Sequence, residues 1–405
     1  MKAFLASVIA LILCSSLAPT SSRSESEGSQ SQVDSRLTAA TTRFSFKLYK
    51  QIRDPRSGNT FVSPASVMVA LAMTYNGAAG TTRQAMARTL EVDGMSLEEV
   101  NRAFADLKSA LTPNDPKVQL TIANSLWARN GFKMKPAFVE RNKEHYGAEI
   151  TNLDFSNPSA ADTINAWVKK NTGGKIEKIV EQIRDEHVLF LINAIYFKGQ
   201  WQVEFKKENT KPDMFRVAGG EPKQLPMMSQ SGNYLYYKGN NFQAVALPYG
   251  KGDVNMFVFL PDEQTSLDQF EKDLTPENWD AWMNSFRLIR GDIKLPRFKV
   301  EWESSLNEAL KTLGMAEAFD GRANFSEMAP LNSGNRLYIS EVKHKSWCEV
   351  NEEGTVAAAA TSVGIGVTSV PPPPFSMKVD RPFFFAIRDS TSGVVLFMGS
   401  VTNPG

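Results

Sequence analysis

The chain has 405 residues, of which 42% are hydrophobic and 22% are charged, as in ordinary globular proteins. Its formal net charge is +1, without a long run of like charge. This balance argues against nucleic acid or an anionic membrane surface as a partner.

The first twenty residues have the pattern of a secretory signal peptide. Lys2 precedes an apolar run from Ala3 to Leu13, and small residues follow. The run is too short to span a bilayer comfortably. We therefore expect residues 1–20 to be a signal peptide whose end the sequence does not define, and the protein to be secreted and extracellular. A buried N-terminal helix, a lipid anchor on Cys14 and a periplasmic location are less favoured alternatives.

Residues 21–35 and the two cysteines indicate how much of the chain is ordered and whether a disulfide stabilises it. Residues 21–35 are polar and lack aromatic side chains, which is typical of a disordered leader. Removal of the signal peptide beyond Cys14 would leave Cys348 as the single cysteine, so no internal disulfide is expected. Cys348 lies in a stretch of alternating apolar residues, which favours a buried thiol.

Helical patterns dominate the first half of the remaining chain. No repeat or linker divides it, so we expect a single domain over residues 36–405. Ser96 and Glu99 form a capping-box pattern at the start of a helix that runs to Leu111. The spacing of apolar residues predicts further helices at 37–52, 66–75, 162–172 and 306–313.

Strand patterns dominate the second half. Residues 188–196 form a nearly continuous apolar run, as a buried strand does. Residues 383–388 and 394–401 flank a DSTSG turn and predict a hairpin. Further strands are expected at 242–247, 255–260, 293–300 and 337–350. Early helices and late strands, without strict alternation, predict an α+β fold with mostly antiparallel sheets.

The sequence offers little support for catalysis. None of His145, His187 and His344 lies in a zinc-binding arrangement such as HExxH. The sequence has neither a GxSxG elbow nor a GxxxxGK[ST] phosphate loop. A triad assembled from distant residues stays open, although each histidine is more simply a surface or core residue. We expect no enzyme, no metal site and no cofactor.

An unusual segment, EEGTVAAAATSVGIGVTSVPPPP, runs from Glu352 to Pro374. It is rich in small residues, and no charge occurs between Glu353 and Lys378. If it were extended, alternate side chains would fall on opposite faces, and one face could be buried. The four prolines prevent its continuation as a central strand. The composition is therefore compatible with a strand and also with an exposed loop.

Six blocks, in order along residues 36–405, resemble the serpin family. The resemblance implies the serpin fold, with a helix-rich N-terminal half and an exposed reactive-centre loop at about 352–374. The blocks are NTFVSPASVMVALAMTYNGAAGTT (59–82), NAIYFKGQWQVEFKKENT (193–210), DVNMFVFLPDE (253–263), IKLPRFKVE (293–301), HKSWCEVNEEGTVAAAAT (344–361) and DRPFFFAIRDSTSGVVLFMGSVTNP (380–404).

The resemblance implies a suicide-substrate inhibitor of proteases. A protease would cut the loop and be held as a covalent 1:1 acyl-enzyme while the loop inserts into a sheet. The family's spacing places the reactive bond at Thr368–Ser369, or one residue earlier, with Ile365 and Val367 as specificity residues. The absence of Lys and Arg there argues for elastase-like or subtilisin-like targets, and papain-like cysteine proteases are a further class. The implied hinge residues are Glu352, Gly354, Thr355, Ala357, Ala358, Ala359 and Ala360.

Other implied features lie outside the loop. The helix at 96–111 has no basic face, so no glycosaminoglycan site is implied. Asn324 is the one N-x-[ST] position. We expect a monomer, and the alternative to an inhibitor is a non-inhibitory serpin that acts as a carrier or chaperone-like binding protein. The resemblance implies that polar and aromatic residues control opening of the large sheet: Ser63, Ser66, Asn193, Trp201, Arg297 and His344.

Overall fold

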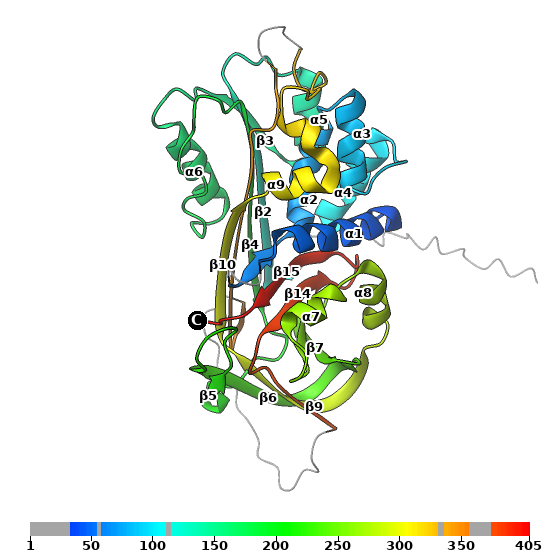
Figure 1. Ribbon diagram of the computed structural model, residues 1–405, viewed down its shortest axis with the longest axis vertical. Helices are drawn as coiled ribbons and strands as arrows, with labels where there is room; N and C mark the ends of the chain where they lie inside the picture. Colours follow the sequence, from blue (N-terminus) through cyan, green and yellow to red (C-terminus); the bar gives the residue numbers. More distant parts are fainter. Residues whose placement is uncertain (1–32, 55–57, 111–114, 331–335, 356–373) are drawn as a thin grey trace, which may run out of the picture. The chain divides into compact units, whose positions relative to one another are not determined.

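The structure is a computed structural model that describes residues 33–54, 58–110, 115–330, 336–355 and 374–405. These residues form one compact unit (Figure 1). Within these ranges, every helix is too short or too polar to serve as a membrane span.

Helices gather mainly on one face of a central sheet. Figure 1 shows α6 on the opposite face, by itself. The helices are α1 (Ser35–Ile52), α2 (Pro64–Tyr75), α3 (Gly80–Thr89), α4 (Leu97–Ala110), α5 (Pro136–Tyr146), α6 (Ala160–Asn171), α7 (Leu267–Lys272), α8 (Pro276–Met283) and α9 (Asn307–Leu310).

The central sheet has the strand order β10-β11-β12-β4-β2-β3. Most of its pairs are antiparallel, but β11 and β4 also pair directly with each other in parallel, as do β2 and β3. Its strands are β2 (Val118–Arg129), β3 (Glu149–Leu153), β4 (Leu189–Gln200), β10 (Phe298–Ser305), β11 (Glu341–Asn351) and β12 (Gly354–Thr355).

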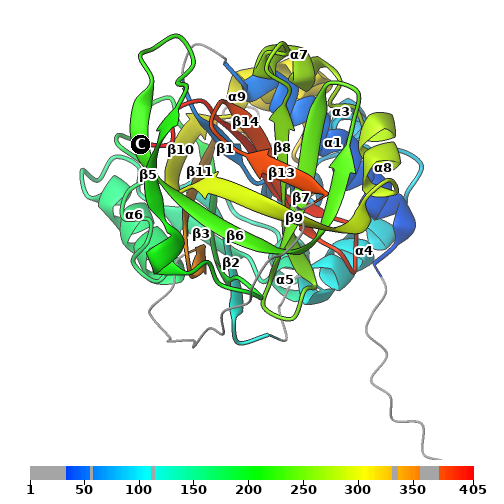
Figure 2. The same cartoon turned by 90° about the horizontal axis from the view of Figure 1, so that it is seen from below.

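A second sheet has the order β1-β15-β14-β8-β7-β6-β9-β13, and β5 pairs with β6. Figure 2 shows β9 between β6 and β13. Its strands are β1 (Thr60–Val62), β5 (Lys211–Phe215), β6 (Lys223–Lys238), β7 (Phe242–Tyr249), β8 (Val254–Pro261), β9 (Arg287–Pro296), β13 (Phe375–Lys378), β14 (Phe383–Asp389) and β15 (Val395–Val401).

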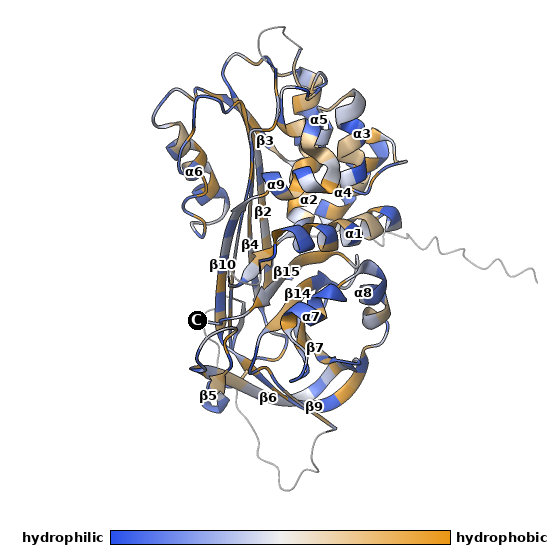
Figure 3. Cartoon of the chain, in the orientation of Figure 1, coloured by the Kyte–Doolittle hydropathy of each residue, from blue (hydrophilic) through white to orange (hydrophobic). Residues whose placement is uncertain are grey.

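The hydrophobic core lies where the two sheets meet α2. Every residue of α2 is buried, and the helix contacts both β4 and β15. A helix that is apolar all round belongs in the interior, whereas an outer helix keeps a polar face. Figure 3 shows hydrophilic and hydrophobic residues side by side on outer helices such as α1 and α3. The N-terminus of α2 is therefore held in the core beneath the central sheet.

Several predictions from the sequence are confirmed. The fold is α+β, and most strand pairs are antiparallel. The capping box forms, because the Ser96 N–H donates to Glu99 Oε2 at 2.8 Å and the Glu99 N–H donates to Ser96 Oγ at 3.2 Å. The predicted C-terminal hairpin is the antiparallel pair β14 and β15.

Three predicted boundaries were wrong. The strand expected at 293–300 is the end of β9 and the start of β10, which belong to different sheets and break at Arg297. The helix expected at 306–313 keeps regular α geometry only through α9, and Gly314 shortly beyond it has a φ of +116°. The leader expected over 21–35 overlaps the fold, since Val33 is buried and Asp34 caps α1 by accepting the Arg36 N–H at 2.8 Å.

Candidate functional site

The two-residue strand β12 lies between β4 and β11. Thr355 is paired with Gly199 on one side and with Val350 on the other, and both pairings are antiparallel. Further along, β4 and β11 pair directly in parallel, as far as Tyr196 and Trp347. Residues 354–355 therefore occupy one end of a seam that is closed along the rest of its length.

Position 354 accepts only glycine without rearrangement. Gly354 has a φ of +139°, and a Cβ atom there would lie 2.0 Å from the Gly199 carbonyl oxygen. The next side chain, Thr355, is fully buried, and its hydroxyl lies 2.8 Å from the Tyr249 hydroxyl. The absence of a side chain at Gly354 thus lets the chain enter the seam closely against β4.

Trp201 anchors the turn that leads into β12. Its indole N–H donates to the Asn351 carbonyl at 2.9 Å, and its backbone N–H donates to the Glu353 carbonyl at 2.9 Å. The indole also stacks on Tyr249, with ring centroids 4.4 Å apart and 11° between the planes. The turn and its glycine are held by an aromatic pair, in which Trp201 directly follows β4 and Tyr249 ends β7.

Glu352 forms an ion pair with Arg297. The Arg297 Nε–H lies 2.9 Å from both carboxylate oxygens, and the Thr210 hydroxyl donates to Oε1 at 2.6 Å. Burial by itself would raise the pKa of the Glu352 carboxyl, but the hydrogen bonds from Arg297 and Thr210 outweigh it and hold this pKa below its usual value. Glu352 is therefore ionised and fixed at the base of the turn.

A second ion pair lies beside the first. The Lys207 ammonium donates to Glu353 Oε1 at 2.7 Å. The other carboxylate oxygen, Oε2, is buried and has no hydrogen-bond partner among the described residues. Two adjacent glutamates thus fasten the turn to Arg297 and Lys207.

A buried polar network closes the seam at its middle. Asn193 on β4 and His344 on β11 are directly opposite each other, and His344 Nδ1 lies 2.5 Å from Asn193 Oδ1. The Ser63 N–H donates to His344 Nε2 at 3.2 Å. Because Nε2 accepts, the proton of the neutral ring is on Nδ1 and is donated to Asn193. Burial lowers the pKa of His344 to about 3, so the ring is neutral.

The same network reaches α2 and β2. The Asn193 amide donates to Asn124 Oδ1 on β2 at 2.5 Å and to the Ser66 carbonyl at 3.2 Å, and it also contacts the Ser66 hydroxyl. Ser63 caps α2 by accepting the Ser66 N–H at 3.3 Å. Separation of β4 from β11 would therefore break the bond between His344 and Asn193 and disturb the start of α2.

Comparison with known protein families identifies the family of this chain. The family model described as "Serpin (serine protease inhibitor)" matches residues 39–404. The chain belongs to the serpin family. The expected serpin fold is confirmed by the solved structures that it resembles.

Relatives of this serpin include named inhibitors and a hormone-binding protein. It is 37% identical to bovine leukocyte elastase inhibitor over 381 residues, which cover 91% of this chain and 99% of the relative. The native thermophilic serpin tengpin is 35% identical, with a TM-score of 0.86 and coverage of 92% and 95% of the two chains. Human thyroxine-binding globulin in complex with its hormone is 26% identical, with a TM-score of 0.82 and coverage of 91% and 98%.

The structure brings together the predicted serpin residues that it describes. Trp201, Glu352 and Arg297 surround the turn before β12, while Ser63, Ser66, Asn193 and His344 form the network described above. The expectation that the loop is exposed from residue 352 was wrong, because residues 352–355 are buried against β4 and β11. Ala357, Ala358, Ala359, Ala360, Ile365, Val367, Thr368 and Ser369 lie outside the described residues and stay predictions.

Four residues that contact the hinge or the buried network were not predicted from the sequence. Asn124 was missed because no strand was predicted at β2. Tyr249, Lys207 and Thr210 were missed because they meet the hinge only through tertiary contacts, more than one hundred residues away along the chain. Lys207 and Thr210 lie within the 193–210 block that resembles the family, and this was the one available signal.

The remaining polar candidates lie elsewhere in the serpin fold. Cys348 is buried and free, as predicted, and burial raises the pKa of its thiol. Asn324 is half-buried, and its side-chain oxygen accepts the Ser326 N–H at 3.1 Å. Across the described ranges, no group of three or more His, Cys, Asp and Glu side chains could hold a metal ion.

Proposed function

We propose that this serpin is a secreted suicide-substrate inhibitor that traps serine proteases as covalent acyl-enzymes by loop insertion. The observation that carries the proposal is the position of β12. Residues 354–355 are already paired on both sides within the seam between β4 and β11. A strand that continued in this direction would lie antiparallel to both neighbours, which is a stable arrangement for a new central strand.

The register of β12 supports insertion of the residues that follow it. Thr355 pairs with Gly199 and Val350, and each further residue would move one position back along both strands. Six residues on, Thr361 would lie opposite position 193 (199 − 6) and position 344 (350 − 6), which are Asn193 and His344. A threonine hydroxyl both donates and accepts, so it can replace the bond that insertion breaks between those side chains.

The residues that would insert after Thr355 are also small enough for the buried positions that they would occupy. Thr355 points into the core toward Tyr249, so Ala357 and Ala359 would share its face. Ala357 would lie opposite Phe197 and Cys348, both fully buried. Small uncharged side chains can enter there without overpacking or the burial of a charge.

The chemistry of the trap is a protease reaction stopped after its first half. The protease serine oxygen attacks the carbonyl carbon of Thr368, the bond to the Ser369 nitrogen breaks, and that nitrogen leaves with a proton as a free amine. Insertion of the released segment then removes the acyl-enzyme from water attack. The free energy comes from the closed, metastable sheet, so the stability of the native state is a matter of rate.

The target class follows from the loop composition. The segment offers no Lys or Arg for an acidic specificity pocket, and Ile365 and Val367 are apolar and β-branched. Elastase-like and subtilisin-like proteases accept such residues, and papain-like cysteine proteases are a further class. The similarity to proteins named leukocyte elastase inhibitor supports the first of these.

Secretion and a monomeric state complete the proposal. The support for secretion is the basic, apolar and small-residue order of residues 1–20, which lie outside the described residues. Expression of the full chain in a secreting host tests it. The protein should appear in the medium with a new N-terminus after residue 14, and size-exclusion chromatography should give a single 1:1 complex with its protease.

The decisive experiment mixes the protein with pancreatic elastase, subtilisin, trypsin and papain. A band that survives denaturing gels at the summed mass would demonstrate the acyl-enzyme. The mass of the released C-terminal fragment would identify its first residue, which we expect to be Ser369. Clean cleavage by every protease without such a band would contradict inhibition of these classes.

The alternative is a non-inhibitory carrier or chaperone-like binding protein. It is supported by the similarity to thyroxine-binding globulin, a serpin solved with a bound hormone. Thermal unfolding after loop cleavage separates the two functions. A large rise in the unfolding temperature of the cleaved protein supports insertion and inhibition, while an unchanged temperature supports the carrier.

A further inference from the structure

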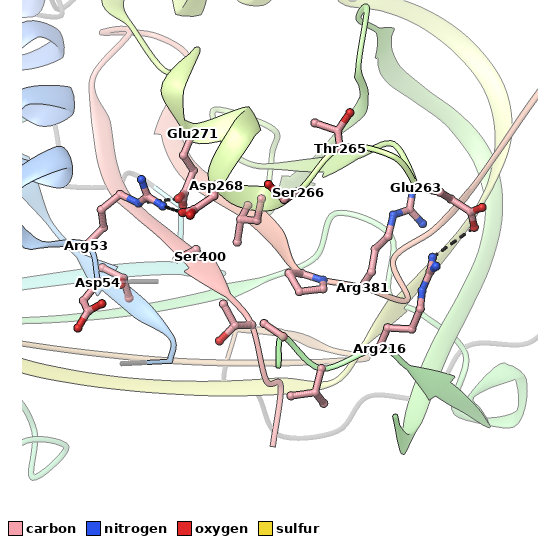
Figure 4. A pocket seen from close by; sticks show the side chains of 16 residues that line it. Arg53, Asp54, Arg216, Glu263, Thr265, Ser266, Asp268, Glu271, Arg381 and Ser400 are labelled. Atoms are coloured by element: carbon pink, nitrogen blue, oxygen red, sulfur yellow. Dashed lines mark hydrogen bonds and ion pairs between the residues drawn. The ribbon is translucent and has the colours of Figure 1, made fainter. Parts of the chain in front are cut away.

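A cavity of about 440 Å³ opens where the end of α1, the start of α7 and the ends of β14 and β15 meet (Figure 4). Its volume falls in the range of small-molecule sites. None of the hinge or network residues described above lines it. Its use would therefore require neither loop insertion nor a protease.

Part of the cavity wall is apolar. Val217, Leu267 and Pro382 line it and are only partly exposed. Val217 and Leu267 also pack against the main hydrophobic core. This wall can cover the hydrocarbon part of a ligand and remove it from water.

Arginine guanidinium groups lie at both ends of the cavity. Arg381 donates from Nε to the Pro261 carbonyl and from Nη1 to Asp380 Oδ1, both at 2.9 Å. Arg216 lies beside it and donates to Glu263 Oε1 at 3.2 Å. Arg53, at the other end, pairs with Asp268 and with the buried Glu271. Figure 4 shows Arg53 on one side of the cavity and Arg216 and Arg381 on the other.

Glu263 and Asp268 are more exposed than the arginines that they meet. Glu263 is 67% exposed and its partner Arg216 is 47% exposed, while the adjacent Arg381 is only 15% exposed. Exposed ion pairs of this kind contribute little free energy. A ligand anion could take the place of Glu263 at Arg216 and lie beside Arg381, with the Glu263 carboxylate turned into solvent.

Besides Glu263, one further acid lies at this end of the cavity. Asp380 holds both guanidinium groups, because its Oδ1 lies 2.9 Å from Arg381 Nη1 and 3.5 Å from Arg216 Nη2. Glu271 is held by Arg53 at 2.6 Å and by the Tyr49 hydroxyl at 2.6 Å. Asp268 pairs with Arg53, and Asp54 points away from the middle of the cavity in Figure 4.

We propose that this cavity binds a small organic anion with an apolar body. The anionic group lies between Arg216 and Arg381 in place of Glu263, and the body lies along Val217, Leu267 and Pro382. Arginine is suited to this role because its planar guanidinium forms charge-assisted hydrogen bonds with carboxylates, sulfonates and phosphates.

The test is a fluorescence titration of the full-length protein with 8-anilinonaphthalene-1-sulfonate. N-phenyl-1-naphthylamine, which has the same rings without the sulfonate, is the neutral comparison. We expect saturable 1:1 binding of the sulfonate and weaker binding of the neutral compound. Arg216→Gln should weaken sulfonate binding about tenfold, because a charge-assisted hydrogen bond is lost.

Two further variants make the test specific. Glu263→Gln removes the competing carboxylate and should tighten sulfonate binding, which a merely structural role for Glu263 does not predict. Ala218→Trp adds bulk at the exposed rim and should abolish binding while the thermal unfolding temperature is kept. Arg290→Gln, an exposed arginine outside the cavity, should leave binding unchanged.

Three results would overturn the proposal. One is the absence of saturable sulfonate binding by the wild type. Another is equal affinity for the sulfonate and the neutral compound, together with no effect of Glu263→Gln. The third is binding that survives Ala218→Trp, which would place the probe elsewhere.

Discussion

The ring of His344 and the amide of Asn193 are joined at 2.5 Å across the parallel pair of strands β11 and β4. Both side chains are fully buried, and the ring receives its second hydrogen bond from the backbone of Ser63. This neutral ring ties together two strands that must separate for a third strand to enter. It therefore links the stability of the closed sheet to pH.

The native protein should lose stability in mild acid through His344. Its pKa is lowered from 6.5 to about 3, so the unfolded chain binds a proton that the folded chain excludes. The contribution is present above the unfolded pKa and is lost as pH falls toward the folded pKa. Between pH 7 and pH 5 we expect a loss of about 2 kcal/mol, from 1.5 pKa units at about 1.36 kcal/mol each.

Thermal unfolding at pH 7 and pH 5 checks this, with His344→Gln as the control. The variant keeps a polar side chain that does not titrate. Carboxylates titrate in both proteins, so the difference between their changes in stability from pH 7 to pH 5 is the contribution of the His344 ring. An identical pH dependence in both proteins would show that His344 is not the titrating group.

Replacement of Gly354 should push β12 out of the seam. A Cβ atom would lie 2.0 Å from the Gly199 carbonyl oxygen, and the φ of +139° is strained for any other residue. We expect Gly354→Ala to cost about 1–3 kcal/mol and to speed amide hydrogen exchange at Thr355 and Val350. Gly321→Ala is a matched control, since a Cβ there has no atom within 4 Å. Equal protection in wild type and Gly354→Ala would contradict the close approach.

Loss of Arg297 should loosen the turn before the hinge. Glu352 is almost completely buried, and without Arg297 its charge keeps only the Thr210 hydroxyl as a strong partner. Because Arg297 is 44% exposed, we expect Arg297→Ala to cost about 1–3 kcal/mol, less than a fully buried pair. Arg322→Ala breaks a surface pair with Asp320 and should cost under about 1 kcal/mol. Equal urea midpoints for the two variants would refute the difference.

The register of β12 predicts that neighbouring alanines respond differently to a charge. Ala357→Glu would place a carboxylate against Phe197 and Cys348 in the core, which should slow insertion and turn the inhibitor into a substrate. Ala358→Glu would point to the other face, between Tyr196 and Trp347, where the Lys175 ammonium lies 5.8 Å from both rings.

Denaturing gels with elastase measure the ratio of complex to cleaved protein for each variant. We expect Ala357→Glu to give cleaved protein almost exclusively and Ala358→Glu to keep most of the complex. The opposite ranking would mean that the inserted strand does not continue in the register of Gly354 and Thr355.

The sequence by itself determined the fold class, the family and most long elements. Alternation and helical spacing report burial of one face, and that signal is local, so β4, α4 and the hairpin of β14 and β15 could be predicted. The same signal did not separate β9 from β10, because the apolar alternation only changes phase at Pro296 and Arg297, which a bulge within one strand would also produce. It also could not find β2, whose pairing partner β4 begins sixty residues later.

The tertiary structure alone decided which groups meet. His344 and Asn193 are 151 residues apart, and Tyr249 and Thr355 are 106 residues apart. Residue type and spacing do not specify such contacts, which depend on how two sheets and a buried helix pack. The composition of residues 352–374 allowed both a strand and a loop. Only the pairing of Gly354 and Thr355 between β4 and β11 showed where the strand begins, because backbone hydrogen bonds form there on both sides.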